Sequence, residues 1–341
     1  MASRLKYDPT ESEELLPNRV FILGAGFSAS AGLPLVPDLS RACLQALQER
    51  DQHDFNVLLR TMQRFFPDTS WSRQWLPNIE DFLDRVLAYE DLFQRHIVVY
   101  PDGYFRNVRR LTSVGLCLAL TVPPENCDMK AINNFVIKKL RPGDAILTFN
   151  WDLLLESSMY LNLPLEQISY CPLASDEVDP SKVTLIKLHG SLDWLDNKEW
   201  RPAPGSENEW EVIGHDIWKA KNRRYFASTS VGVPAFIIPP TSRKIYDHHP
   251  DIRQLWDVGF WLAHEAEEIY IIGYGFPKAD IHAKALVQSA ILNNSHRHEL
   301  KVRLINRDED ALTLFCKDIA PSTTCDISHF QGRFEQHPMA L

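Results

Sequence analysis

The sequence predicts an α/β fold built on a parallel sheet, from two observations. Arg19–Leu23 is a short apolar run with the pattern of a strand that is buried on both faces, and it is one of five short strand candidates that together look like a parallel sheet. The other four are Ala145–Phe149, Thr184–Leu188, Glu268–Ile272 and Lys301–Ile305. Between the first two runs, apolar residues recur at spacings of three and four, which is typical of amphipathic helices. We therefore expect a Rossmann-like parallel sheet in a domain over residues 18–310, followed by a C-terminal segment over residues 311–341.

The first predicted strand runs directly into a glycine turn, Gly24-Ala25-Gly26-Phe27-Ser28. Two glycines spaced by one residue let the backbone turn tightly and approach a ligand without interference from a Cβ atom. If a helix begins near Ser28, its N–H groups face the same point, which favours a pyrophosphate. The dinucleotide fingerprint is incomplete, because Ala29 stands where a third glycine is usual and no acidic residue ends a second strand. A tight turn without a ligand is therefore the alternative.

Two insertions are expected within the sheet domain. The first, over about residues 40–140, is helical: Leu39–Phe66 and Ile79–Gln94 carry the helical spacing, and Pro77–Asp81 has the pattern of a loop that leads into a capped helix. The second, over about residues 193–257, is rich in loops. Its Pro239-Pro240 and His248-His249-Pro250 steps favour turns rather than regular structure.

The composition excludes several classes of protein. The chain has 341 residues, 45% of them hydrophobic, and a net charge of −9 that argues against general nucleic-acid binding and against binding to anionic membranes. Ser3–Asn18 is polar and has no signal-peptide core, and no apolar run reaches the ~18 residues that span a bilayer. These features predict a soluble cytoplasmic protein.

No metal site is expected from the sequence. The six cysteines are widely scattered and form no C-x-x-C pair, which argues against a zinc ribbon and against a dense disulfide framework. The histidines His248, His249 and His264, with Glu265, lack the spacing of the H-E-x-x-H zinc motif.

Glycine, amide, carboxylate and imidazole groups follow the predicted strands at the point where each strand ends. They are Gly24-Ala25-Gly26, Asn150-Trp151-Asp152, His189-Gly190, Gly273-Tyr274-Gly275 and Asn306. In parallel sheets, ligands bind beyond the carboxyl ends of the strands. We therefore expect these residues to meet in one site.

In this order and spacing, the motifs resemble those of the sirtuin superfamily. The matching pieces are Gly24–Ser28 with Ala31-Gly32-Leu33-Pro34, Thr148–Asp152, Lys187–Ser191, Ile271–Phe276 and Leu304–Asn306. More narrowly, the chain looks like the bacterial sirtuin-like proteins that cleave NAD in anti-phage defence, which also have an Asp such as Asp280 and no zinc module. Leu35-Val36-Pro37 departs from the Asp-Phe-Arg of protein deacylases, and the four zinc cysteines are missing. Lysine deacylation is therefore not expected.

The resemblance implies that NAD is the substrate and that no metal is needed. The residues expected to bind it are Gly24, Ala25, Gly26, Phe27, Ser28, Gly273, Tyr274, Gly275 and Asn306. Gly26→Val is expected to abolish binding and to leave the fold largely intact.

Cleavage of the nicotinamide–ribose bond passes through an oxocarbenium-like state, so the site must orient the ribose and stabilise positive charge. The amide of Asn150 suits the ribose or the attacking water, Asp152 suits the cation, and His189 suits a general base. We expect Asn150→Ala and His189→Ala to slow cleavage while NAD⁺ still binds. A structural role is the alternative: Asn150 and Asp152 as caps of a helix near Leu153, and His189 and the glycines as turn residues.

The resemblance predicts an NAD⁺ glycohydrolase that yields nicotinamide and ADP-ribose and that acts as a regulated, NAD-depleting effector in anti-phage defence. Such a protein is expected to form a homo-oligomer or to pair with a partner defence protein. An ADP-ribosyltransferase and a non-catalytic module that binds NAD or ADP-ribose are the alternatives. The presence of both Asn150 and His189 favours an enzyme, because a binding module needs the glycines but no base.

Overall fold

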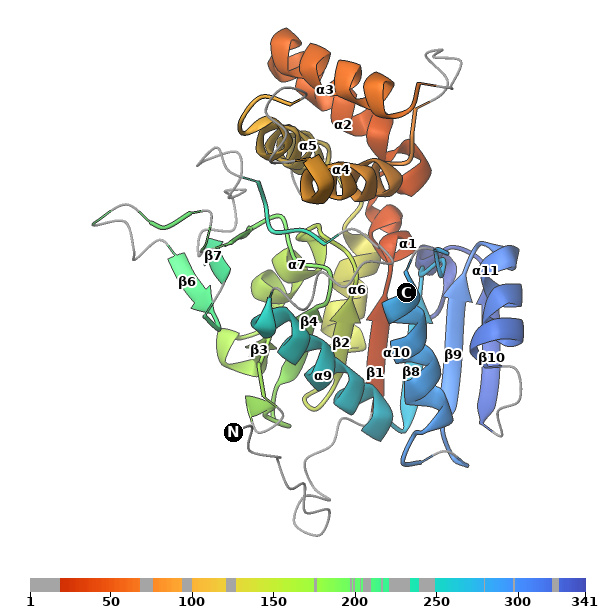
Figure 1. The fold of residues 1–341 in the computed structure, drawn as a ribbon. Coiled ribbons are helices and arrows are strands. Elements are labelled where there is room, and N and C mark those ends of the chain that lie inside the picture. The colour runs from red at the N-terminus through yellow and green to blue at the C-terminus, as the bar shows by residue number, and fades with distance from the viewer. Residues whose placement is uncertain are drawn as a thin grey trace.

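A computed structural model gives the fold (Figure 1). It describes residues 19–67, 76–93, 100–120, 127–174, 177–196, 198, 200–202, 204, 210–215, 217–220, 234–238, 249–278, 280–296, 298–320 and 325–341. The predicted polar segment Ser3–Asn18, the Pro239-Pro240 step and His248 lie outside these ranges.

The described residues form one large sheet, in the order β10-β9-β8-β1-β2-β4-β3, in which every pairing is parallel. Its strands are β1 (Arg19–Leu23), β2 (Ala145–Thr148), β3 (Ile168–Tyr170), β4 (Val183–Lys187), β8 (Glu268–Ile272), β9 (Lys301–Asn306) and β10 (Asp326–Gln331). The predicted α/β class and all five predicted strands are confirmed. The two edge strands β3 and β10 were not predicted, and β10 belongs to the C-terminal segment.

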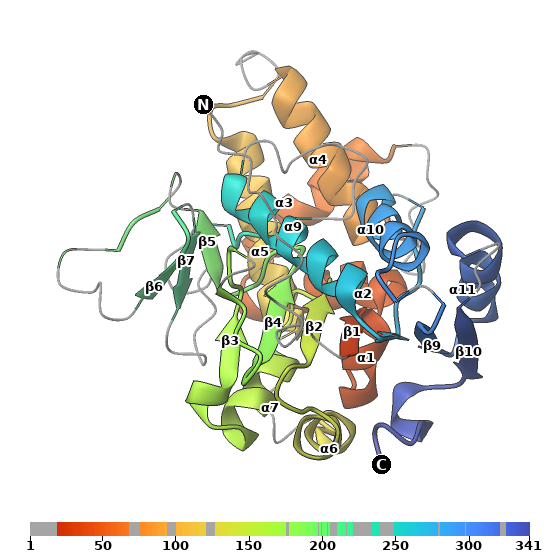
Figure 2. The same cartoon turned by 90° about the horizontal axis from the view of Figure 1, so that it is seen from below.

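Helices cover both faces of the sheet, which is why its central strands β8, β1 and β2 are mostly apolar. Along β1, Val20 and Ile22 pack on one side with α9 (Pro250–Glu265) and α10 (Ile281–Leu292). Phe21 and Leu23 pack on the other side with α6 (Lys130–Lys138) and α7 (Leu154–Asn162). Figure 2 shows the two pairs of helices on opposite sides of the strands.

The first insertion is helical, as predicted. It contains α2 (Val36–Arg50), α3 (Gln52–Phe65), α4 (Ile79–Phe93) and α5 (Tyr104–Leu120). The helical pattern over 39–66 is divided at Asp51, because its extended backbone ends α2 and its carboxylate accepts hydrogen bonds from the backbone N–H groups of His53 and Asp54 at the start of α3. In Figure 1 this bundle lies beyond the edge of the sheet where β1 ends.

The second insertion contains more regular structure than the loops predicted for it. A small antiparallel sheet joins β5 (Trp194–Asp196), β7 (Ile217–Ala220) and β6 (Trp210–Ile213) in that order. Pro250 begins α9 instead of extending a loop, because proline is well suited to the first position of a helix, where no N–H donor is needed.

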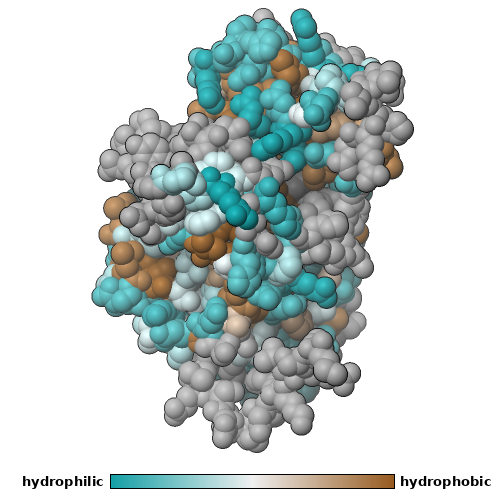
Figure 3. All heavy atoms as spheres, turned by 60° about the vertical axis from the view of Figure 1, so that its left-hand side comes forward, coloured by the Kyte–Doolittle hydropathy of each residue, from teal (hydrophilic) through white to brown (hydrophobic). Residues whose placement is uncertain are grey.

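Apolar patches alternate with hydrophilic residues on the face shown in Figure 3. Large exposed apolar side chains in the described ranges include Leu161 and Leu165, near the end of α7. No helix in the described part of the chain is long and apolar enough to cross a membrane.

Candidate functional site

The glycine turn after β1 packs directly against the loop after β8. The N–H of Gly24 donates to the carbonyl of Ile272 (3.0 Å), and the N–H of Gly26 donates to the carbonyl of Gly273 (2.9 Å). A Cβ atom on Gly24 would lie 2.6 Å from the Cα of Tyr274, and one on Gly26 would lie 2.7 Å from the Cα of Gly273. These glycines are therefore needed for contact between the two loops, whatever they also do for a ligand.

This contact corrects the expectation that Gly26→Val would leave the fold intact. A valine side chain at position 26 has no room, because backbone atoms rather than a flexible side chain occupy its place. Gly273 contributes to the same restriction from the other loop, where its φ is +63°. Gly275, in the same loop as Gly273, differs from these glycines, because a Cβ atom added there would meet nothing within 4 Å.

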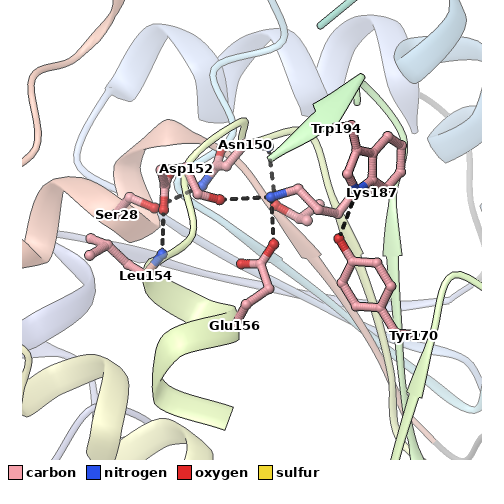
Figure 4. Close-up of polar contacts among 9 residues, drawn as sticks. Ser28, Asn150, Asp152, Leu154, Glu156, Tyr170, Lys187 and Trp194 are labelled. Carbon is pink, nitrogen blue, oxygen red and sulfur yellow. Dashed lines mark hydrogen bonds and ion pairs between the residues drawn. The ribbon is translucent and has the colours of Figure 1, made fainter. Parts of the chain in front are cut away.

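Asn150 joins the end of β2 to the glycine turn, as Figure 4 shows. Its side-chain amide Nδ2 donates to the carbonyl of Gly24 (3.0 Å) and to the Oγ of Ser28 (3.1 Å). Its Oδ1 accepts no hydrogen bond from the described residues and remains for a ligand. Asn150 therefore has a structural task, bracing the turn, and one oxygen left for chemistry.

Asp152 makes the capping contact that the sequence left open as an alternative. Its carboxylate accepts a hydrogen bond from the backbone N–H of Leu154, the first residue of α7 (3.0 Å). The buried ammonium of Lys187 anchors the same loop. It donates to the backbone carbonyl of Asp152 (2.7 Å) and to the carboxylate of Glu156 (2.6 Å; Figure 4). Burial raises the pKa of Glu156, and the charge of Lys187 opposes that effect.

His189, at the end of β4, lies in a buried slot and is only 3% exposed. Its ring contacts Phe149, with centroids 4.9 Å apart, and Trp256, with centroids 5.9 Å apart. Its Nε2 faces the Oδ1 of Asp280 at 3.6 Å. The predicted imidazole is thus at the strand ends, with a carboxylate as its partner.

Asp280 contacts three groups, one from a distant part of the chain and two from its own loop and the helix that follows it. Besides His189, the hydroxyl of Tyr274 donates to its Oδ2, and the backbone N–H of Ala283 donates to its Oδ1. Burial opposes the charged form of Asp280, but His189 and these donors outweigh burial and lower its pKa. Asp280 is therefore a carboxylate that is held in the charged form beside the imidazole.

The remaining predicted binding residues divide into two groups. Asn306 braces the loop after β8, because its Nδ2 donates to the carbonyl of Tyr274 (2.8 Å), and Ala25 and Gly275 keep some surface exposed. The ring of Phe27 lies in the core, 5.5 Å from that of Phe135 and 4.8 Å from that of Phe334. The side chain of Phe27 therefore packs in the core and is not available to a ligand at the strand ends.

Glu80 is a residue of this region that the sequence analysis missed. It lies in the first turn of α4, within the Pro77–Asp81 segment that was expected only as a loop leading into a capped helix. Burial raises its pKa to about 8, and the negative charges of Asp280 and Asp81 add to that effect. The helical insertion thus places a second carboxyl group close enough to Asp280 for their charges to interact.

Glu80 should make the stability of the protein depend on pH. The unfolded carboxyl ionises near 4.5, whereas the folded one keeps its proton up to about pH 8, so the free energy of unfolding falls as pH rises between these values. Glu80→Gln removes this dependence and should be more stable than the wild type at pH 8 by on the order of 4 kcal/mol, with little difference at pH 4.5. Urea unfolding at both pH values measures this. Glu49→Gln, on the exposed face of α2, is the matched control and should leave the profile unchanged.

A cavity of about 130 Å³ lies beside this region, between the helical insertion and the second insertion. Leu83 of α4, Arg109 of α5, Phe236 and His249 are among its lining residues, and Asn150 and His189 are not.

Among the residues that the structure describes, no group of three or more His, Cys, Asp or Glu side chains is placed to hold a metal ion.

Comparison with known proteins identifies no family for the chain. No protein-family model matches it, and no curated protein sequence is similar to it. Among solved structures, it is similar to a crystal structure of Sir2 in complex with the inhibitor EX-527, 2'-O-acetyl-ADP-ribose and a deacetylated p53 peptide. The two chains are 12% identical, the match covers 93% of this chain and 89% of the other, and the TM-score is 0.37. A TM-score this low carries no argument, and the site stands on its own geometry.

Proposed function

We propose that this chain is an NAD⁺ glycohydrolase that cleaves NAD⁺ to nicotinamide and ADP-ribose. The observation that carries the proposal is the placement of Asn150 and His189 at the ends of the paired strands β2 and β4, with Asn150 bonded to the glycine turn after β1. Carboxyl ends of parallel strands are where nucleotides bind in open α/β sheets. The resemblance of these strand-end motifs to the sirtuin superfamily supports NAD as the nucleotide.

In this proposal the exposed parts of the two glycine loops and Asn306 hold the pyrophosphate and the adenosine. The Oδ1 of Asn150 accepts a hydrogen bond from a ribose hydroxyl or from the attacking water. His189 takes a proton from the same group, which is a contribution typically worth roughly 10²–10⁴-fold in rate. The carboxylate of Asp152 accepts the backbone N–H of Leu154 at the start of α7, and from this position its negative charge favours the cationic transition state.

We further infer that the activity is regulated, in keeping with a role as an NAD-depleting effector in anti-phage defence. Unrestrained NAD⁺ hydrolysis would harm the host cell, and His189 is almost completely buried. A substrate or an activating partner must therefore widen the access to His189 before cleavage. A second copy of the chain or a partner protein in the cytoplasm would supply such a step.

The products of the reaction test the proposed function. Purified protein is incubated with NAD⁺ in excess chelator, with and without a protein acceptor, and nicotinamide and ADP-ribose are separated by chromatography. Equal amounts of nicotinamide and unattached ADP-ribose support the proposal. ADP-ribose attached to the acceptor would indicate a transferase, and NAD⁺ binding without nicotinamide would indicate a binding module; either result contradicts hydrolysis. The same products are measured in cells that express the chain, where an activating partner is available.

A further inference from the structure

His189 is held on three sides by residues that come from distant parts of the chain. The rings of Phe149 and Trp256 contact its ring, and the indole Nε1 of Trp256 donates to the carbonyl of Leu188, the preceding residue (2.9 Å). On the third side is the carboxylate of Asp280, which is itself buried. The imidazole plane is thereby restricted, and one defined nitrogen, Nε2, faces the carboxylate.

We propose that Asp280 is the positioning residue for His189: it holds the proton of the neutral imidazole on Nε2 and leaves the lone pair of Nδ1 for the reacting group. This inference rests on the proposed function, because it assigns a reacting group to Nδ1. The placement of Asp280 beside Nε2 of His189 is a property of the protein without a ligand. Nε2 is buried and has no hydrogen-bond acceptor among the described residues nearer than Asp280. Hydrogen bonds of this kind are often long before a substrate binds and tighten in the complex.

The surroundings of Asp280 suit this task. Tyr274 occupies Oδ2 through its hydroxyl, which leaves Oδ1 for Nε2 and for the longer contact from the N–H of Ala283 (3.3 Å). Glu80, whose pKa the charge of Asp280 affects, keeps its proton at neutral pH because burial raises that pKa to about 8. Of these two carboxyl groups, only Asp280 is therefore charged at neutral pH.

The proton transfer is balanced within this arrangement. When Nδ1 takes a proton from water, the water oxygen bonds to the anomeric carbon of the ribose, and the bond from that carbon to nicotinamide breaks. Nicotinamide leaves with the electron pair as a neutral molecule, and the ring becomes an imidazolium with protons on both nitrogens. Asp280 stays ionised and stabilises that cation. A carboxylate with this relation to histidine sets the tautomer and the orientation of the ring, and its replacement by an amide favours the wrong tautomer.

A purely structural role for Asp280 makes a different prediction. Asp280 precedes α10, and its carboxylate accepts the N–H of Ala283, so it is also the N-cap of that helix. Asparagine caps helices about as well as aspartate. Asp280→Asn therefore removes the charge beside His189 and retains the cap, which separates the two roles.

The test measures the tautomer of His189 and the turnover of NAD⁺ on the same protein. The chain has 12 histidines, so the protein is labelled with ¹⁵N-histidine and the signal of His189 is assigned from its loss in His189→Gln. We expect the neutral ring to carry its proton on Nε2 in the wild type and the Nδ1–H form to become populated in Asp280→Asn. The kcat of Asp280→Asn should fall about 10²-fold or more with KM changed by less than about threefold.

The controls distinguish positioning from capping. Asp51→Asn changes the N-cap carboxylate of α3 in the same way, far along the chain from His189, and should alter neither measurement. Tyr274→Phe removes the hydroxyl that holds Oδ2 and should reduce kcat by a smaller factor than Asp280→Asn does. An Asp280→Asn protein with the wild-type tautomer and the wild-type kcat would overturn the proposal. If the wild type releases no nicotinamide, the hydrolase proposal fails, and the tautomer of His189 in the two proteins still decides the role of Asp280.

Discussion

His189→Gln is expected to slow nicotinamide release from NAD⁺ by at least about 10²-fold, with a much smaller change in NAD⁺ affinity. The reason is that glutamine can fill the slot between Phe149 and Trp256 but cannot accept a proton from water or a ribose hydroxyl. The adenosine and pyrophosphate would still meet the glycine loops and Asn306. Single-turnover rates and calorimetric NAD⁺ binding, measured on one preparation, separate the two effects.

The matched control for this variant is His53→Gln, an exposed histidine in α3 that should leave the rate unchanged. A stable His189→Gln protein with wild-type turnover would remove the proposed base from the mechanism.

Asn150→Ala does not separate NAD⁺ binding from cleavage in the way that the sequence suggested. Its amide braces Gly24 and Ser28, so its loss should lower NAD⁺ affinity together with the rate.

Gly26→Val is expected to destabilise the protein by at least about 3 kcal/mol, because overpacking against backbone cannot be relieved by moving a side chain. The new Cβ would lie 2.7 Å from the Cα of Gly273, and the loop after β8 would have to move away from the loop after β1. Chemical denaturation measures this loss. A Gly26→Val protein as stable as the wild type would contradict the loop contact that the structure shows.

Gly275→Val tests nucleotide binding by the loop after β8, whereas Gly26→Val tests the stability of the fold. A side chain there meets open space, so the melting temperature should stay close to that of the wild type. If the β8 loop holds the nucleotide, the added side chain should weaken NAD⁺ binding by at least about tenfold, or about 1.4 kcal/mol. Unchanged affinity in a well-folded Gly275→Val protein would place the nucleotide away from this loop.

The sheet was predictable where both of its faces are covered. Strands such as β1 and β2 are apolar over most of their length because helices pack on each side, and that pattern is visible without a structure. The edge strand β10, Asp326–Gln331, was missed because its side chains are mostly exposed and carry no such run. The end of α2 at Asp51 was missed for a local reason, since a capping carboxylate can interrupt a helical pattern without changing its apolar spacing.

By itself, the sequence determined the α/β class, the order of the motifs and the edge of the sheet at which they meet, because parallel strands bring their carboxyl ends together. Only the tertiary structure decided what each residue does there. Gly26 and Gly273 are required by the contact between two loops, Asn150 braces one of these loops, and His189 faces Asp280. These roles depend on distances between residues that lie far apart in the chain, and the pattern of a single strand or helix contains no information on such distances.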